Sequence, residues 1–283
     1  MLELQSMDPW EGVAGWASAP RNDAWLVLLR RHAPGARVLE WGAGAGVWAV
    51  VAAKLGAKRV IVVEPTDLAD VARALVAANG VADVVEVREG RLADQVPEPV
   101  DLAFTARIGP EPFADGLPAE LEAAARWLAP GGRIAPRRLR VMGALAESTW
   151  TGDEATAARE ELAAWSAAYD LDFGPVQAAL DAAPPYRLFT EAEDPIGPAI
   201  AVWDLAIGKR PRPRIVEMGA PGDAGGALQW LEAELDDGLI LGGPPGTGSP
   251  WPALVCGWAD RIATPARIRW TTSGGRIIAT PVG

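Results

Sequence analysis

The chain has 283 residues, 49% of them hydrophobic, and a formal net charge of −11 from 37 acidic and 26 basic residues. This apolar content excludes a disordered chain, and the length suffices for one large domain or two smaller ones. A surface that binds nucleic acid needs clustered Lys and Arg, so the acidic balance disfavours that partner. The sequence has no uninterrupted apolar run long enough to cross a bilayer, so we expect no membrane partner either.

The single cysteine and the single histidine narrow the chemistry further. Cys256 alone supplies neither a disulfide framework nor a zinc cluster, and the first residues lack the basic and apolar regions of a signal peptide. We therefore expect a cytoplasmic protein without a metal site. A Ser–His–Asp triad or a two-histidine metal site would need histidine, and His32 is expected to cap a helix or lie on the surface instead.

Glycine and proline divide the first half of the chain into alternating helical and strand-like segments. In chain order we expect a helix at 22–32, a strand at 37–40, a helix at 47–55, a strand at 60–64, a helix at 68–78, strands at 84–88 and 100–105, and a helix at 118–128. Strands that alternate with helices at this spacing predict an α/β fold with a doubly wound, Rossmann-like parallel sheet. The basic cluster at 133–140 is expected to be a solvated segment between domains.

The pattern changes after about Pro136. Residues 154–182 have a helical pattern, and short alternating runs separated by Gly and Pro follow them. These runs lie at 199–207, 226–235, 239–241, 254–258, 267–270 and 276–280. Such runs predict an antiparallel barrel or sandwich. We therefore expect a Rossmann-like domain with N-terminal helices at 1–136 and a β-barrel-like domain at 137–283.

The most informative stretch is the turn after the first expected strand. That strand ends in Glu40, and three alternate glycines follow it, Gly42, Gly44 and Gly46. The next strand also ends in an acid, Glu64. Glycines let a ligand approach the backbone, and Glu64 is suited to accept hydrogen bonds from a ribose. The pattern predicts a nucleotide-type site at the carboxyl end of a parallel sheet, with a purely structural turn as the alternative.

The pattern E-x-G-x-G-x-G, with an acid directly before the loop, resembles the first motif of class I methyltransferases. The resemblance implies an enzyme whose cofactor is S-adenosyl-L-methionine. Electrostatics agree, because this cofactor carries an ammonium and a sulfonium but has no pyrophosphate to bind at a helix N-terminus. The carboxylate of Glu40 would favour those positive charges and repel a phosphate.

The order of features along most of the chain is similar to that of the protein arginine methyltransferases. After the sheet motif and the run at 128–136, residues 165–173 are similar to the family's segment near its dimerisation arm. Residues 230–238 are similar to a barrel strand and turn, and 242–251 to a Gly/Pro-rich loop with a tryptophan. This resemblance implies a helical arm at about 151–185, a homodimer, and a peptide or small-molecule methyl acceptor.

The same resemblance assigns the cofactor contacts. Arg21 matches the arginine that pairs with the methionine carboxylate, and Leu92 falls where the family holds adenine through its backbone. The three glycines would line the methionine portion, Glu40 would brace the loop and the ammonium, and Glu64 would hold the ribose. A surface position at the start of a helix is the alternative for Arg21.

The chain departs from the family in the loop that binds the acceptor. The family has two glutamates there, and they clamp a guanidinium. Here Ala106 takes the place of the first, and the second position is Ala114 or Asp115. The family's Thr-His-Trp loop has become Ser249-Pro250-Trp251, without the histidine.

Arg107 changes the charge expected of this loop, because an arginine repels a cationic substrate and attracts a carboxylate. The leading hypothesis is methyl transfer to an N or O atom of an acceptor that need not be arginine, with Arg107 as its anchor. Glu111 or Asp115 would act as base for a protonated nucleophile, although both acids are also typical of a solvated loop. The alternatives are a guanidino-N-methyltransferase in which these two acids rebuild the clamp, and a non-catalytic dimeric scaffold.

Overall fold

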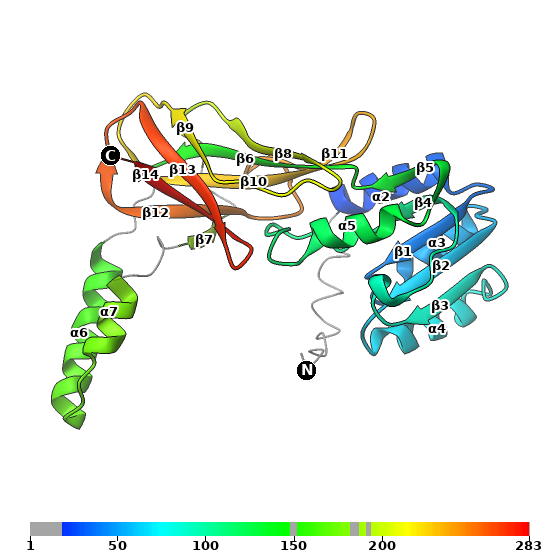
Figure 1. Ribbon diagram of the computed structural model, residues 1–283, viewed down its shortest axis with the longest axis horizontal. Helices are drawn as coiled ribbons and strands as arrows, with labels where there is room; N and C mark the ends of the chain where they lie inside the picture. Colours follow the sequence, from blue (N-terminus) through cyan, green and yellow to red (C-terminus); the bar gives the residue numbers. More distant parts are fainter. Residues whose placement is uncertain (1–18, 148–151, 182–186, 191–193, 283) are drawn as a thin grey trace.

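The computed structural model describes residues 19–147, 152–181, 187–190 and 194–282. These residues form two lobes, and a helical arm extends from the second lobe (Figure 1). Residues 1–18, where part of the expected N-terminal helices would fall, lie outside the described ranges. None of the described helices combines the length and the apolar composition needed to span a bilayer.

The first lobe is a parallel sheet of five strands in the order β3-β2-β1-β4-β5. Helices α2, α3 and α4 lie side by side against it, and α5 packs on β4 and β5 (Figure 1). The elements are α2 Ala19–His32, β1 Arg37–Trp41, α3 Val47–Lys54, β2 Arg59–Glu64, α4 Leu68–Ala78, β3 Val85–Glu89, the 3-10 helix η1 Leu92–Asp94, β4 Val100–Phe104, α5 Leu117–Ala125 and β5 Leu128–Ala135. The expected Rossmann-like sheet is confirmed, and its strand order reverses between β1 and β4, where such sheets bind ligands.

The second lobe is antiparallel and contains two sheets. One has the order β7-β12-β10-β6-β8 with β11 added to β10, and the other has the order β14-β13-β9. The strands are β6 Arg138–Ala146, β7 Arg187–Thr190, β8 Ile200–Ala206, β9 Arg214–Met218, β10 Ala224–Asp236, β11 Leu239–Gly242, β12 Ala253–Ile262, β13 Ala266–Ser273 and β14 Arg276–Val282. The indole of Trp258 on β12 donates to the carbonyl of Ala279 on β14 at 3.0 Å, so the sheets share one core. The expected barrel-like antiparallel half is confirmed.

Two expectations at the boundary between the lobes were wrong. The expected helix at 118–128 ends at Ala125, and the Pro–Gly–Gly run lies inside β5, where the register with β4 shifts. Gly131 has φ 79° there, a backbone conformation that suits a bulge as well as a turn. The basic cluster is not a solvated segment either. It lies on β5, on β6 and between them, and Arg137 and Arg140 form ion pairs with Glu234 on β10.

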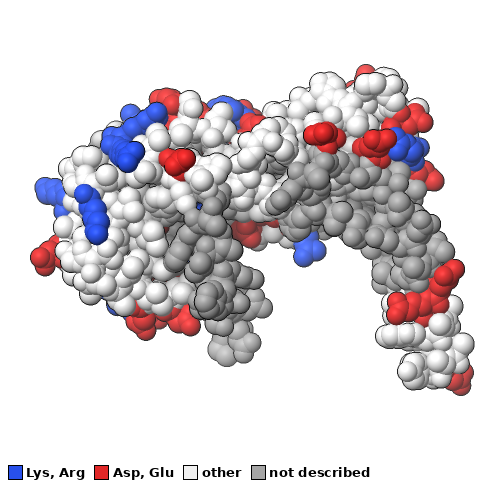
Figure 2. Space-filling model, turned by 180° about the vertical axis from the view of Figure 1, so that it is seen from behind, with Lys and Arg blue, Asp and Glu red and all other residues white. Residues whose placement is uncertain are grey.

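The helical arm consists of α6 Gly152–Tyr169 and α7 Gly174–Asp181. It projects away from both lobes, and the view from behind shows acidic side chains on its described part (Figure 2). The rings of Trp165 and Phe173 meet edge to face with centroids 6.3 Å apart. Trp165 nevertheless stays 50% exposed and Leu171 55% exposed, so the arm presents apolar side chains to its surroundings.

The lobes are joined by an ion-pair cluster around Asp236, at the end of β10. The His32 ring contacts this carboxylate at 2.9 Å and Arg31 donates to it at 3.2 Å, both from the last turn of α2. Burial by itself would raise the pKa of Asp236, but hydrogen bonds from His32, the Asp237 backbone and Arg31 outweigh it and lower the pKa to about 2. His32 therefore links the two lobes.

Candidate functional site

The glycine loop lies between the end of β1 and the start of α3, at the carboxyl edge of the parallel sheet. Gly42, Gly44 and Gly46 all have positive φ, between 56° and 73°. A Cβ on Gly46 would come within 3.1 Å of the Cβ of Ala72, and one on Gly42 within 3.0 Å of the Nε of Arg107. Both the backbone conformation and the close packing require glycine.

Glu64, at the end of β2, is held by three hydrogen bonds. Its Oε2 accepts from the backbone N–H of Gly44 at 2.7 Å, and its Oε1 accepts from the N–H and the hydroxyl of Thr66. Glu64 therefore braces the glycine loop, and Glu40, expected to brace it, accepts from the backbone N–H of Ala49 in the first turn of α3. An ionised carboxylate has about four acceptor positions, so one remains for a ligand hydroxyl.

Glu40, at the end of β1, is the most unusual acid of the site. Only 1% of it is exposed, and its Oε2 is buried without a hydrogen-bond partner among the described residues. Burial raises the pKa of Glu40 to about 8, the backbone N–H of Ala49 and the charge of Arg21 oppose that shift, and Glu64 adds to it. A buried carboxyl oxygen left without a partner is costly unless a cationic or donating ligand pairs with it.

Arg21 lies in the first turn of α2 and reaches across to the loop after β4. Its guanidinium donates to the carbonyl of Ala106 at 2.7 Å. Burial lowers the pKa of Arg21, and the nearby charge of Glu40 acts in the opposite direction. The structure therefore brings Arg21 and Glu40 into one electrostatic environment beside the glycine loop.

Leu92 begins the 3-10 helix that follows β3, and its side chain is buried in the core. The preceding Gly90 has φ 120°, and its N–H donates to the carbonyl of Glu64 at 2.9 Å. The segment after β3 is therefore tied directly to the end of β2. Its neighbours Ala93 and Asp94 are exposed.

The loop after β4 (residues 105–116, hereafter the acceptor loop) places Arg107 over the glycine loop. The Nη2 of Arg107 lies 2.5 Å from Oε1 of Glu120 in the first turn of α5, and the Trp41 indole donates to the other oxygen at 3.2 Å. Burial acts to lower the pKa of Arg107, but Glu120 and the neighbouring acids outweigh it and raise the pKa. Because Glu120 neutralises its charge, Arg107 attracts a carboxylate less strongly than the sequence suggested.

The two candidate acids follow on the same loop. The N–H groups of Ala114 and Asp115 both donate to the carbonyl of Glu111, so a tight turn separates the two carboxylates. Partial burial raises the pKa of Asp115, the charge of Arg107 lowers it, and Glu111 and Glu120 raise it again. A raised pKa makes a carboxylate a better proton acceptor.

The Gly/Pro-rich loop of the second lobe reaches the start of α2. A Cβ on Gly248 would lie 3.9 Å from Pro20, the residue before Arg21. Trp251 is buried and packs against Gly242, where a Cβ would come within 2.8 Å of its ring. Trp251 therefore packs as a core residue.

Sequence reasoning missed Glu120 and Thr66. Glu120 had a usable signal, because an acid in the first turn of a helix that begins at the carboxyl edge of a parallel sheet faces the ligand side. Thr66 follows Glu64 by two residues and donates two hydrogen bonds to its carboxylate. These bonds depend on a turn that no local sequence pattern predicts.

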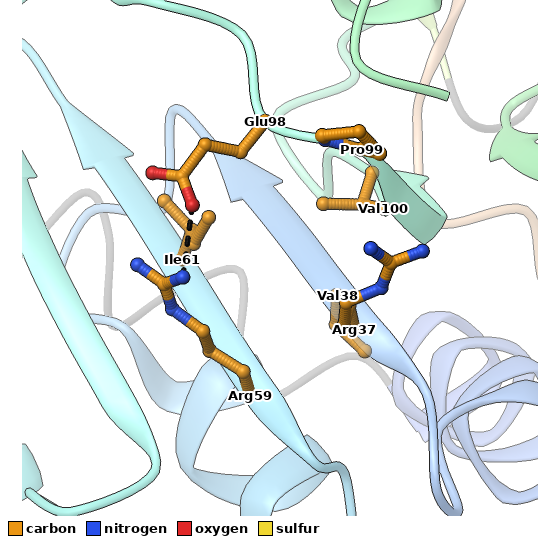
Figure 3. Close-up of a pocket in the computed structure, with 7 residues that line it drawn as sticks. All are labelled: Arg37, Val38, Arg59, Ile61, Glu98, Pro99 and Val100. Carbon is orange, nitrogen blue, oxygen red and sulfur yellow. Dashed lines mark hydrogen bonds and ion pairs between the residues drawn. The ribbon is translucent and has the colours of Figure 1, made fainter. Parts of the chain in front are cut away.

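A small cavity of about 120 Å³ lies at the opposite, amino edge of the sheet. Figure 3 shows Arg37 and Arg59 flanking it, with Arg59 paired to Glu98. Arg37 is also paired, to Asp101 at 3.1 Å. Since parallel sheets bind ligands at their carboxyl edge, this cavity is separate from the candidate site.

Comparisons with known proteins find methyltransferases that are similar to this chain in sequence and fold. A family model described as ribosomal protein L11 methyltransferase (PrmA) matches residues 25–132. The protein arginine N-methyltransferase PRMT10 of Arabidopsis thaliana is 38% identical over 129 residues, which is 43% of this chain and 33% of that protein. The chain therefore spans about a third of the length of that relative. An arginine N(omega)-methyltransferase of Streptomyces achromogenes subsp. streptozoticus is 29% identical over 249 residues, 84% of this chain and 67% of that protein.

Solved structures match nearly the whole chain. That of Arabidopsis thaliana protein arginine methyltransferase 10 has a TM-score of 0.80 at 20% identity and covers 95% of this chain and 91% of its own. The Trypanosoma brucei PRMT1 enzyme-prozyme complex has a TM-score of 0.69 at 18% identity and covers 91% and 86%. The expected resemblance is confirmed: the chain has a class I methyltransferase fold. Its two-lobed architecture is that of the arginine methyltransferases.

Proposed function

We propose that this protein is an S-adenosyl-L-methionine-dependent methyltransferase. The observation that carries the proposal is the buried Oε2 of Glu40, which has no partner among the described residues and lies beside three glycines with positive φ. A cationic ligand at the loop would satisfy this oxygen and favour the ionised form of the carboxyl. The named relatives add support, since the Trypanosoma brucei complex is described with AdoHcy bound.

The residues present fit this cofactor. Arg21 would hold the methionine carboxylate, and Glu40 would hold the ammonium. The free acceptor position of Glu64 would take a ribose hydroxyl, and the backbone at Leu92 would hold the adenine. When bound, the cofactor would supply a methyl group on a sulfonium: the acceptor's lone pair would form the new bond to the methyl carbon as the S–C bond breaks, with its electron pair left on the sulfur. The main contribution of the protein is then to align the acceptor with that methyl group.

We propose a peptide or small-molecule acceptor that reacts through N or O. A nucleophile that carries a proton must lose it, and the carboxylates of Asp115 and Glu111, both on the acceptor loop, would take it. The guanidino-N alternative is favoured by one specific observation. A guanidinium, that of Arg107, is already held beside the glycine loop by Glu120 at 2.5 Å, so an acid that pairs with such a group lies next to the loop. The Streptomyces relative is itself named an arginine N(omega)-methyltransferase.

The experiment for the activity is transfer of label from methyl-labelled S-adenosylmethionine to free arginine, arginine-rich peptides and carboxylate-bearing peptides. We expect labelled product, and mild base separates the two acceptor classes. Label released as methanol means a methyl ester and supports Arg107 as a carboxylate anchor. Base-stable label on arginine supports the guanidino alternative. Tight cofactor binding without transfer to any of these acceptors would point to an acceptor outside the panel, whereas absence of cofactor binding would favour the scaffold alternative.

We propose further that the arm makes a homodimer. The two helices and the turn between them keep Trp165, Tyr169, Leu171 and Val176 between 45% and 68% exposed, and such apolar side chains are suited to a second copy of the chain. We also propose a division at about residue 136, between the parallel and antiparallel sheets. We propose a cytoplasmic location as well, supported by a sequence with one cysteine, which cannot form a disulfide within the chain.

A further inference from the structure

Two parts of the second lobe pack against the acceptor loop. From β8, the ring of Trp203 meets that of Phe113 edge to face, with centroids 5.9 Å apart and an interplanar angle of 84°. From the C-terminal hairpin, the turn between β13 and β14 lies against Phe113 and Ala114. The segment that carries the candidate acids is therefore supported by the opposite lobe.

The contact at the hairpin turn involves backbone on both sides. A Cβ on Gly275 would lie 2.5 Å from the Cα of Ala114, 2.7 Å from its N and 2.7 Å from the carbonyl oxygen of Phe113. Real Cβ atoms do not approach backbone so closely, so a side chain at this position must push the acceptor loop or the hairpin away. Gly274, the other residue of the turn, has nothing within 4 Å of its Cβ position.

A displacement at Ala114 would reach both candidate acids. The N–H of Ala114 donates to the carbonyl of Glu111 at 3.1 Å, and the carbonyl of Phe113 accepts from Gly116 at 3.4 Å. The Asp115 side chain packs over Gly109, where a Cβ would come within 3.1 Å of its Oδ2. These contacts are short and local, so the turn cannot shift without moving the carboxylates that it carries.

We propose that the β13–β14 turn, through the close approach of Gly275, is a positioning element for the carboxylates of Glu111 and Asp115. The C-terminal hairpin thereby sets the geometry of acceptor binding without touching the acceptor or the cofactor. The effect on catalysis rests on the proposed function. The structural claim, that the hairpin holds the acceptor loop, is tested separately by hydrogen exchange.

The test compares Gly275→Ala with Gly274→Ala in the full-length protein. Both glycines have positive φ, 79° and 56°, so both variants carry the backbone strain of alanine in a left-handed conformation. Only Gly275→Ala also brings a Cβ against the backbone of Phe113 and Ala114. We expect hydrogen exchange of the amides at 114–117 to accelerate by about tenfold or more relative to the control. We also expect kcat to fall by about tenfold to a hundredfold, with the Kd of S-adenosylhomocysteine unchanged.

Equal exchange in the two variants would overturn the proposal. If Gly275→Ala does not fold, Phe113→Leu weakens the second support and is expected to accelerate the same amides by a smaller factor; unchanged exchange there would also overturn it. A wild-type protein that neither binds S-adenosylhomocysteine nor transfers methyl groups would contradict the proposed function instead. The exchange comparison would still decide whether the hairpin positions the loop.

Discussion

The guanidinium of Arg107 and the carboxylate of Glu120 lie 2.5 Å apart, and the Trp41 indole fixes the other oxygen of that carboxylate. This pair joins the acceptor loop to α5 directly over Gly42. From sequence alone, Arg107 is expected to present an unopposed positive charge to the acceptor. With Glu120 present, the charge that an acceptor meets depends on both residues.

Changing one member of this pair should change the acceptor preference. Arg107→Ala leaves the Glu120 carboxylate unpaired, so the Kd of arginine in the presence of S-adenosylhomocysteine should fall by about fivefold, the equivalent of about 1 kcal/mol for a partly exposed pair. Glu120→Gln should have the opposite effect. Glu122→Gln is the matched control, because Glu122 lies on the same helix and is paired with Arg210. Weaker arginine binding by Arg107→Ala would contradict this account.

Cofactor binding should be linked to the protonation of Glu40. Burial raises the pKa of Glu40 to about 8, so the carboxyl is mostly protonated in the free site at pH 7. A cationic ligand favours the ionised form, so binding should release a proton below pH 8, and affinity should rise by up to about tenfold per pH unit towards that value. Calorimetry in buffers of different ionisation enthalpy measures the release. Glu40→Gln should remove it, and release that persists in this variant would contradict the assignment.

The ion-pair cluster between the lobes should stabilise the fold in a defined pH window. The pKa of Asp236 is lowered to about 2, below its unfolded value. Its contribution is therefore fully present above about pH 4, is lost as the pH falls towards 2, and amounts to about 2 kcal/mol. Asp236→Asn should lower the free energy of unfolding in urea by that amount at pH 6 and by less at pH 3. Asp237→Asn, at the exposed neighbouring position, should have little effect. If the loss of unfolding free energy in Asp236→Asn were the same at pH 6 and pH 3, the lowered pKa of Asp236 would be excluded as its cause.

The sequence predicted the regular elements well where local signals agreed. Helix α4 has the predicted bounds because Leu68 begins an apolar periodicity and Asn79-Gly80 ends it. Strand β5 was missed because Gly131 at a bulge looks the same in sequence as a glycine at a turn. Strand β6 was missed because its alternating arginines indicate a solvated segment, whereas they pair with Glu234 and Asp204 across the sheet.

In the candidate site, too, the relationships between residues close in sequence were predicted and those between distant segments were not. Glu40, the three glycines and Glu64 are close in sequence, so a local motif was enough to bring them together. The partnership between Arg107 and Glu120 depends on how α5 packs on β4 and β5, and the contact between Gly275 and Ala114 joins segments about 160 residues apart. Neither relationship leaves a pattern in a single sequence.

The arm should control the oligomeric state. Trp165→Asp places a charge on the apolar face of the arm, so a dimer that uses this face should dissociate. Val71→Asp is the matched control, since Val71 on α4 is also 50% exposed but lies on the first lobe. Size-exclusion chromatography with light scattering should show a dimer for the wild type and the control and a monomer for Trp165→Asp. A wild-type monomer at micromolar concentration would contradict the proposed dimer.

The central claim is that the carboxyl edge of the parallel sheet binds S-adenosylmethionine, and calorimetric titration with S-adenosylhomocysteine tests it most directly. We expect one site per chain in the wild type. Glu64→Ala should weaken binding because it removes the ribose contact and the brace on Gly44, and Glu89→Ala, at the exposed end of the neighbouring strand β3, should not. Absence of binding, or equal affinity in all three proteins, would contradict the account.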